Sequence, residues 1–372
     1  MKIVTIVGTR PELIKLSAVI KKLDRFCEHL LIHTGQNFDF ELNEIFFKDL
    51  EIRKPDIFLE AAGDNFAYTI SKIISKSYDV LVKERPDGIL LYGDTNSCLS
   101  VIVAKKLKIP VFHMEAGNRC FDERVPEEIN RKIVDHLSDI NMPISDHARK
   151  YMEREGILPD TIIKIGSSMP EVLNNQRAKI TSSNILSTLD LKEKDFFVVS
   201  LHREENVDSS KNLKNIIETI NEIGRVYRKK IIFSMHPRTK SRLNSFGLDV
   251  KLSNRVIQSK PLGFNDYIKL QQSSFCVISD SGTISEESSI LKFPAITIRQ
   301  SHERPEAMDE GTVIMTGFIT KNVVESIKVV TDSDRGEIKT AMDYTPENVS
   351  EKVVRIIFSY VDYIDRNVWK KF

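Results

Sequence analysis

The sequence predicts two doubly wound α/β domains that face each other across a cleft. Short apolar runs alternate with longer amphipathic runs, and this series starts again at residue 196. The alternation is typical of parallel strands, because parallel neighbours need a crossover connection that a helix usually supplies. The length of 372 residues also favours two domains, since a domain contains about 150 residues.

The spacing of apolar residues predicts the elements of the first half. The run at residues 3–7 is rich in β-branched residues and ends at Gly8. Pro11 stands where the first turn of a helix tolerates proline, and apolar residues follow it at three- and four-residue spacing. The further predicted elements are strands at residues 29–33, 88–91 and 111–114 and a helix at residues 66–82.

The second half repeats the pattern. Residues 166–170 and the polar residues 174–183 predict a linker between the halves, and residues 346–365 form a last amphipathic helix. The predicted strands of the second half are residues 196–200, 231–235, 275–279 and 294–298, with helices at 213–223 and from Thr283 onward.

The composition narrows the class of protein. The 54 Lys+Arg against 53 Asp+Glu give a net charge of +1, which argues against a nucleic-acid binder. No apolar run reaches the length of about 18 residues needed to cross a bilayer, and the apolar start is too short for a signal peptide. The cysteines (Cys27, Cys98, Cys120 and Cys276) have no spacing typical of a zinc site or a disulfide framework. We expect a soluble, cytoplasmic protein without a membrane partner.

Carboxylates stand where ligands bind in such sheets, at the carboxyl ends of the strands. Asp94 follows the predicted strand at residues 88–91, Glu115 follows the one at 111–114, and Glu127 opens the next helix. Taken singly, Asp94 could be a helix N-cap, and Glu127 could be a first-turn acid favoured by the helix dipole. Together they indicate general acid–base catalysis, because close carboxylates raise one another's proton affinity.

The strand ends also carry groups that suit a diphosphate. Arg10 offers a planar fork for phosphate, although a plain turn with an exposed arginine is an equal alternative. His202 follows the first strand of the second half and is flanked by Arg203. Ser281 and Gly282 offer hydroxyl and N–H donors at a helix start.

Two further side chains suit a nucleoside. Glu287, a turn into the helix from Thr283, could accept both hydroxyls of a ribose. Tyr267 could present its ring to a base, although a packing tyrosine is the commoner role. No Gly-x-Gly-x-x-Gly fingerprint occurs, which disfavours a nicotinamide dinucleotide.

The ordered set of motifs resembles the non-hydrolysing UDP-N-acetylglucosamine 2-epimerase family. The similarity runs from residue 3 to about residue 317, and jointly these motifs are highly specific. The motifs are Gly8-Thr9-Arg10-Pro11-Glu12, Gly35-Gln36, Gly93-Asp94-Thr95, His113-Met114-Glu115-Ala116-Gly117, Pro126-Glu127-Glu128-Ile129-Asn130-Arg131, His202-Arg203-Glu204, His236-Pro237, Asp280-Ser281-Gly282-Thr283-Ile284-Ser285-Glu286-Glu287 and Glu303-Arg304-Pro305-Glu306.

The resemblance implies a GT-B-type pair of Rossmann-like domains and a homodimer that binds a UDP-sugar. It implies no metal and no nicotinamide cofactor. The expected division is an N-terminal domain at residues 1–170, a UDP-binding domain at 171–345 and a final helix at 346–372 that packs back on the first domain. The implied catalytic residues are Asp94, Glu115, Glu127 and His202, and the implied substrate contacts are Arg10, Ser281 and Gly282 for the diphosphate, Glu287 for the ribose and Tyr267 beside the uracil.

The implied reaction inverts carbon 2 of the sugar. Carbon 2 has no adjacent carbonyl, so expulsion of UDP from carbon 1 is needed before a carboxylate can take the proton. One carboxylate then acts as base and another as acid on the opposite face. Which carboxylate takes which step stays open at the level of sequence.

Two departures from the family pattern bear on substrate and regulation. The family usually has Gln-His in its allosteric signature, whereas this chain has Gln36-Asn37. The resemblance implies that the segment from Glu115 to Glu127 is about two residues shorter than in the common enzymes of the family. It is similar to the capsule and O-antigen branch that converts a UDP-6-deoxy-L-talose-type sugar to UDP-N-acetyl-L-fucosamine, and Phe121 and Val125 are expected to line its sugar pocket.

Other functions remain to be weighed. A GT-B glycosyltransferase shares the fold and the UDP site but needs a single catalytic base. A hydrolysing epimerase would release UDP, and a non-catalytic sensor would not need the catalytic set. The sequence therefore favours an epimerase that supplies a surface polysaccharide precursor, either by UDP-GlcNAc/UDP-ManNAc exchange or by the 6-deoxy counterpart.

Overall fold

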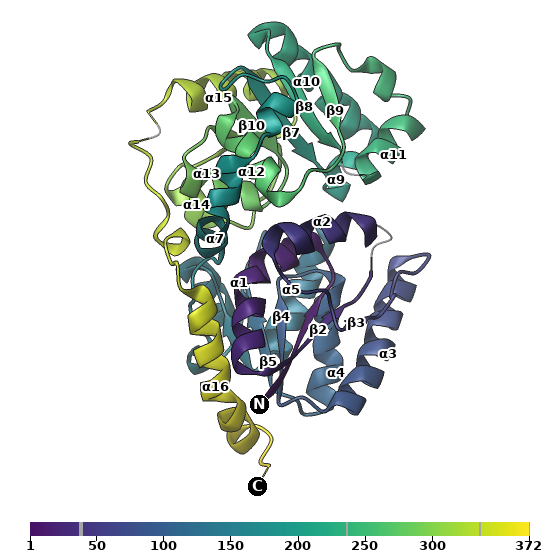
Figure 1. Ribbon diagram of the computed structural model, residues 1–372, viewed down its shortest axis with the longest axis vertical. Coiled ribbons are helices and arrows are strands. Elements are labelled where there is room, and N and C mark those ends of the chain that lie inside the picture. Colours follow the sequence, from purple (N-terminus) through teal and green to yellow (C-terminus); the bar gives the residue numbers. More distant parts are fainter. Residues whose placement is uncertain (37–39, 236, 335, 372) are drawn as a thin grey trace. The chain divides into compact units, whose positions relative to one another are not determined.

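Two compact α/β units make up the computed structural model, which describes residues 1–36, 40–235, 237–334 and 336–371 (Figure 1). The first unit contains Met1–Asn175 and Thr345–Phe372, and the second contains Gln176–Tyr344. Each unit has a six-stranded sheet in which every described pair of neighbours is parallel. The predicted α/β class with two doubly wound units is confirmed.

The sheet of the first unit has the strand order β3-β2-β1-β4-β5-β6. Its central strands are buried along their whole length, because helices cover both faces of a parallel sheet. The strands are β1 (Lys2–Val7), β2 (Glu28–His33), β3 (Ile57–Phe58), β4 (Gly88–Tyr92), β5 (Val111–Met114) and β6 (Ile140–Met142).

The helices of the first unit begin at recognisable caps. Thr9 is the cap residue of α1 (Arg10–Phe26), its backbone N–H donates to Glu12 at 3.0 Å, and Pro11 occupies the first turn. The side chain of Asn65 accepts a hydrogen bond from Tyr68 N at 3.1 Å at the start of α3 (Phe66–Glu84). The other helices are α2 (Phe40–Leu50), α4 (Val101–Lys106), α5 (Pro126–Leu137), α6 (Asp146–Arg154) and α7 (Met169–Ser182), which continues into the second unit, with short 3-10 turns η1 (Asn96–Ser100) and η2 (Pro159–Thr161).

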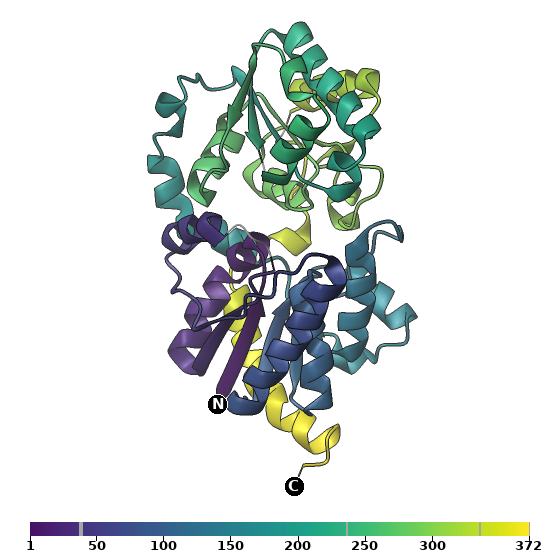
Figure 2. The same ribbon diagram turned by 90° about the vertical axis from the view of Figure 1, so that its right-hand side faces the viewer.

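The last helix, α16 (Val349–Asn367), belongs to the first unit and packs beside α1 (Figure 1). Its apolar face is buried, and Ser350 N donates to Glu171 at 2.8 Å at its start. Lys22 and Glu351 form an ion pair at 3.2 Å between the two helices. Both chain termini therefore lie in the first unit (Figure 2).

The second unit repeats the topology of the first, with the strand order β12-β11-β10-β7-β8-β9. Alternate residues of β7 (Phe196–Leu201) point to opposite faces, so Phe197 and Val199 join one apolar core and Phe196 and Val198 join the other. The other strands are β8 (Lys230–Met235), β9 (Val256–Ser259), β10 (Cys276–Ser279), β11 (Ala295–Thr297) and β12 (Ile314–Met315).

The helices of the second unit cover both faces of its sheet (Figure 2). The long helices α10 (Ser210–Tyr227) and α15 (Thr320–Asp332) pack on one core, whereas α12 (Phe264–Ser273) and α13 (Thr283–Leu291) pack on the other. Among the described residues, we find no helix with the length and hydropathy of a membrane span. The shorter elements are α8 (Ile185–Thr188), α9 (Glu204–Val207), α11 (Pro237–Ser245), α14 (Pro305–Asp309), η3 (Asp249–Lys251) and η4 (Met342–Tyr344).

The direction of strand progression reverses once in each sheet. The reversal lies between β1 and β4 in the first unit and between β7 and β10 in the second. In open parallel sheets, ligands bind beyond the carboxyl ends of the strands at this switch point. The loops after these strands are therefore the places where each unit offers a site.

Candidate functional site

The loops after β1 and β4 meet at the switch point of the first unit. Arg10 is the first residue of α1, and its guanidinium carbon lies 5.5 Å from the centroid of the Phe46 ring. Glu12 is 2% exposed and fastens the two loops together. It accepts hydrogen bonds from Gly8 N and Thr9 N on one side and from the hydroxyls of Thr95 (2.5 Å) and Ser97 (2.8 Å) on the other.

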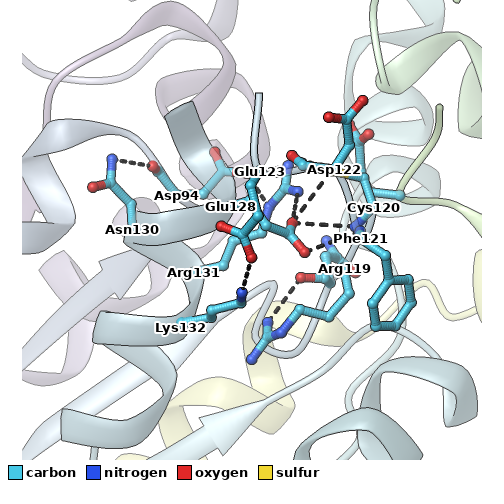
Figure 3. A network of polar contacts seen from close by, with 12 residues as sticks. Asp94, Arg119, Cys120, Phe121, Asp122, Glu123, Glu128, Asn130, Arg131 and Lys132 are labelled. Carbon is cyan, nitrogen blue, oxygen red and sulfur yellow. Dashed lines mark hydrogen bonds and ion pairs between the residues drawn. The ribbon is translucent and has the colours of Figure 1, made fainter. Parts of the chain in front are cut away.

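Asp94 follows β4 and is held by helix α5 (Figure 3). Arg131 donates from Nε to Oδ2 of Asp94 at 2.8 Å, and its Nη2 lies 2.7 Å from the same oxygen. Asn130 donates to the backbone carbonyl of Asp94 at 2.9 Å. The N-cap alternative is not met, because the 3-10 turn that follows has Thr95 as its cap residue.

Glu115 follows β5, the neighbour of β4. Its φ of 62° places it in the left-handed region, which is uncommon for a residue other than glycine and is found at functional sites. The Tyr92 hydroxyl donates to its Oε2 at 2.5 Å. Behind it, the buried His113 ring contacts Gly93 O through Nε2 (2.8 Å), and its Nδ1 lies 3.0 Å from Asp135. Glu115 thus stands on a rigid, hydrogen-bonded base.

Glu127 lies in the first turn of α5, directly after Pro126 at the helix start. The adjacent acid has a different role, since Glu128 is fully buried and accepts from the backbone N–H groups of Cys120 and Phe121 at 3.1 Å each (Figure 3). Burial alone would raise the pKa of Glu128, but these hydrogen bonds and the guanidinium of Arg131 lower it. Glu128 therefore shapes the loop, while Glu127 is half-buried at its end.

The first unit therefore brings four of the predicted site residues to one edge of its sheet. Asp94 and Glu115 follow adjacent strands, and Asn130, on the helix whose first turn contains Glu127, contacts Asp94. Arg10 follows β1 at the same edge.

In the second unit, His202 follows β7 and is supported by Asp280 at the end of β10. Both backbone N–H groups of His202 and Arg203 donate to the Asp280 carboxylate, at 3.1 and 3.0 Å. The Nδ1 atom of His202 lies 3.2 Å from Oδ1 of Asp280, which fixes the ring. Asn206 donates to Asp280 at 2.8 Å. The imidazole is 39% exposed and so accessible to a ligand.

Ser281 and Gly282 lie at the start of α13. Gly282 is the cap residue of that helix, and a Cβ there would lie 2.6 Å from Oε1 of Glu303. Glu303 is 4% exposed and accepts from Arg203 at 3.0 Å and from Arg299 at 2.7 Å. Helix N–H groups and the guanidinium of Arg203, 3.7 Å from the position of a Cβ on Gly282, suit the close approach of an anion.

Glu287 and Tyr267 lie on neighbouring helices of the second unit. Glu287 is 7% exposed and accepts from Gln271 Nε2 at 2.7 Å. Tyr267 is half-buried and packs against the core that contains Phe196 and Val198. Burial raises the pKa of Tyr267, and the Glu287 carboxylate raises it further. Tyr267 thus has the packing role that the sequence indicated as the commoner alternative.

Some expectations about loops need correction or lie outside the described residues. Val125 is 2% exposed, so the expectation that it offers an apolar surface to the sugar is wrong, since it is buried where α5 begins. Phe121 is 71% exposed and lies edge-on to Tyr151 at 5.1 Å. Asn37 and His236, which belong to two of the motifs, lie outside the described residues.

The residues that hold the site in place were not among the site residues predicted from the sequence. Arg131 holds Asp94 and Asp280 holds His202, whereas Glu12 binds Thr95 in the loop after β4 and Glu128 binds the backbone of Cys120. The Thr9–Glu12 spacing is a capping-box signal, and it could have pointed to Glu12. Among the described residues, no group of three His, Cys, Asp or Glu side chains is placed to hold a metal ion.

Comparison with known proteins gives consistent similarities. A family model described as UDP-N-acetylglucosamine 2-epimerase matches residues 21–358. The solved structure of UDP-N-acetylglucosamine 2-epimerase from Rickettsia bellii is 49% identical, covers 100% of both chains and has a TM-score of 0.91. The Methanocaldococcus jannaschii UDP-GlcNAc 2-epimerase in complex with UDP-GlcNAc and UDP is 35% identical, covers 96% of this chain and 100% of that one, and has a TM-score of 0.92.

A relative with a different sugar in its name is also similar. The UDP-2,3-diacetamido-2,3-dideoxy-D-glucuronate 2-epimerase of Pseudomonas aeruginosa is 35% identical over 334 residues, which are 88% of this chain and 92% of the relative. Proteins similar to this chain thus differ in the sugar that their names specify.

Proposed function

The chain belongs to the UDP-N-acetylglucosamine 2-epimerase family and is an isomerase, and from that premise we propose how its residues act on a UDP-N-acetylhexosamine. The reaction is inversion at carbon 2 by elimination and re-addition of UDP. The observation that carries the assignment of residues is their position: all lie at or beside the carboxyl edge of one of the two sheets, and Arg10, Asp94, His202, Ser281 and Gly282 lie at the switch points.

The proposed chemistry begins with loss of UDP. The bond between carbon 1 and the phosphate oxygen breaks, and its electron pair leaves with UDP. A carboxylate takes the proton from carbon 2, and the C–H electrons form the double bond of a 2-acetamidoglycal. Return of a proton to the other face of carbon 2 and of UDP to carbon 1 completes the inversion. Two groups of opposite protonation state are needed, one on each face.

We assign the proton work to the carboxylates of the first unit, Asp94, Glu115 and Glu127. The fixed positions of Asp94 and Glu115 support this assignment, because acid–base catalysis requires groups held within hydrogen-bond reach of the reacting atom. The Tyr92 hydroxyl donates a hydrogen bond to Glu115 and so holds the carboxylate that we propose carries the proton.

We assign the diphosphate to Arg10, His202, Ser281 and Gly282. Charge develops on UDP as it departs, and N–H groups, a guanidinium and an imidazole stabilise that charge. Arg203, whose Nη2 lies 3.7 Å from the position of a Cβ on Gly282, supports an anionic ligand at this helix start. Glu287, buried beside Gln271, is the proposed ribose contact, and Tyr267 the aromatic group beside the uracil.

We also propose a cytoplasmic homodimer that supplies a precursor of a surface polysaccharide, with a 6-deoxy sugar as its preferred substrate. The support for the sugar preference is Phe121, which is exposed and has a φ of 55° while its N–H is held by Glu128. An exposed aromatic residue kept in the left-handed region is strained, and such strain clusters at ligand-binding sites. Family relatives that differ in their named sugars are consistent with a loop that selects the sugar.

The test is incubation of the enzyme with a UDP-N-acetylhexosamine in deuterium oxide. Elimination predicts that recovered UDP-sugar carries deuterium at carbon 2. An epimer that keeps the original proton would overturn the mechanism. A glycosyltransferase would instead form no epimer and would release UDP only when an acceptor is present, so NMR of the mixture separates the two activities.

A further inference from the structure

Arg131 joins two parts of the site that are distant in the sequence. It lies on α5 and is 3% exposed, and its partner Asp94 is 37 residues away. Its Nε and Nη2 reach Asp94, whereas Nη1 donates to Glu128 at 2.8 Å (Figure 3). A planar guanidinium can serve two carboxylates at once in a fixed geometry, which a lysine cannot do.

The contacts on Asp94 leave one of its oxygens available. Both Arg131 atoms contact Oδ2, at 2.8 and 2.7 Å. Within the part of the chain that the structure describes, no hydrogen bond reaches Oδ1, and the side chain is 21% exposed. The guanidinium of Arg131 thus holds the Asp94 carboxylate by Oδ2 and leaves Oδ1 accessible.

The contacts on Glu128 extend to the loop at residues 117–126. Oε2 of Glu128 accepts from Cys120 N and Oε1 accepts from Phe121 N, both at 3.1 Å. The same Oε2 accepts from Arg131. A chain of contacts therefore runs from Asp94 through Arg131 and Glu128 to the backbone of the loop between Glu115 and Glu127.

We propose that Arg131 is a positioning residue for the epimerisation: it presents Oδ1 of Asp94 to the substrate and, through Glu128, holds the loop at residues 117–126 in register with that oxygen. This inference rests on the proposed function. Arg131 does not touch the substrate in this scheme, so its loss impairs the chemical step and leaves UDP binding intact. Misplacement of a reacting group by about 1 Å can slow a reaction by about a hundredfold.

The experiment compares wild type with Arg131→Lys, Arg131→Met, Asp94→Asn and the Asp94→Asn/Arg131→Met double variant. Steady-state kinetics gives kcat and KM, and calorimetry gives the Kd for UDP. We expect Arg131→Met to lower kcat about a hundredfold with the UDP Kd within about threefold of wild type. Arg131→Lys keeps the charge and can still contact Asp94, although it cannot serve both carboxylates, so it should recover only about tenfold of that loss. The double variant should be within about threefold of Asp94→Asn, because Arg131 acts through Asp94.

The matched control is Arg225→Met, which removes another arginine paired with a glutamate three residues before it, but at an exposed position of the second unit. Its kcat should equal that of wild type. If Arg131→Met does not fold, the Asp94→Asn/Arg131→Lys double variant completes the same cycle. The inference would be overturned if the loss of kcat in the double variant equalled the product of the losses in the two single variants. It would also be overturned if Arg131→Met had the kcat of wild type. Failure of the proposed function would give a different result: the wild-type protein itself would form no epimer, although its Kd for UDP could still be measured.

Discussion

The carboxylate of Glu12 accepts a hydrogen bond from the hydroxyl of Thr95 at 2.5 Å, so a residue in the first turn of α1 fastens the loop that carries Asp94. Ser97 donates to the same oxygen at 2.8 Å. Two loops that are far apart in the sequence are thus joined by one buried side chain. The relative position of Arg10 and Asp94 depends on this junction. Because the junction joins two loops of the fold, the protonation state of Glu12 should affect the free energy of unfolding.

The stability of wild type relative to Glu12→Gln should fall as pH rises. Burial raises the pKa of Glu12 from 4.5 to about 7, against hydrogen bonds from Thr95 and from the Gly8 N–H that lower it. The folded protein therefore binds this proton more tightly than the unfolded chain, so the contribution is complete below pH 4.5 and is lost as pH rises through about 7. The expected loss is about 3 kcal/mol, since one pKa unit corresponds to about 1.4 kcal/mol.

Urea unfolding of both proteins across this pH range measures the difference. The glutamine has the shape of the protonated acid, so other titrating groups cancel between the two proteins. A difference that is constant with pH would show that Glu12 has the same pKa in the folded and unfolded states.

Removal of any proposed catalytic group should slow turnover. Asp94→Asn, Glu115→Gln and Glu127→Gln are each expected to lower kcat by about a hundredfold or more, as loss of a general acid or base usually does. His202→Ala should lower kcat by a similar factor, because it removes a group that stabilises the charge on the departing UDP. The matched control is Glu218→Gln, an exposed carboxylate on α10, which should keep the wild-type rate. Near-wild-type turnover of Glu127→Gln would mean that this acid only stabilises the start of α5.

Gly282→Ala should weaken the binding of UDP. The added methyl group would lie 2.6 Å from Oε1 of Glu303, which would have to move together with its partners Arg203 and Arg299. We expect KM to rise by about tenfold with a smaller change in kcat, because the change affects binding in the ground state and in the transition state alike. Gly224→Ala on α10 is the control, since its Cβ meets the nearest atom at 3.5 Å. An unchanged Kd for UDP would exclude close approach of the diphosphate to Gly282.

The choice of sugar should depend on Phe121. If its exposed ring contacts carbon 6, a hydroxymethyl group there loses a polar partner, and the 6-deoxy-L-talo substrate is favoured over UDP-GlcNAc by about tenfold or more in kcat/KM. Phe121→Ala should reduce this ratio and leave the UDP Kd unchanged. Competition between the two substrates, followed by NMR, gives the ratio directly. A wild-type preference for UDP-GlcNAc would contradict the 6-deoxy assignment and leave the epimerase function intact.

The sequence predicted β1, β2, β4, β5, β7, β8, β10 and β11 but not β3, β6, β9 and β12. Residues 88–91 and 111–114 correspond to β4 (Gly88–Tyr92) and β5 (Val111–Met114), because continuous apolar runs mark strands that are buried on both faces. The two-residue strands β3 and β12 are too short to show a period, and they exist through pairing with β2 and β11. Such pairing depends on tertiary structure and leaves no local signal.

The same distinction, between local sequence signals and contacts that only the fold creates, applies to the residues of the site. Asp94 and Glu115 could be predicted, since a carboxylate directly after a buried strand stands out against its apolar neighbours. Arg131 could not, because an arginine within an amphipathic helix normally faces water, and here its buried position depends on Asp94 and Glu128. Residues that position others are recognised only when the fold brings their partners to them.

The first unit is assembled from both ends of the chain, since Thr345–Phe372 packs with Met1–Asn175. Residues are made in the order of the sequence, so the surface of α1 that α16 covers stays open to water until residues 349–367 have been made. The second unit is continuous in sequence and can close while translation is still in progress. The first unit is therefore begun before the second unit and completed after it, and a messenger truncated after Tyr344 would yield a first unit that lacks α16.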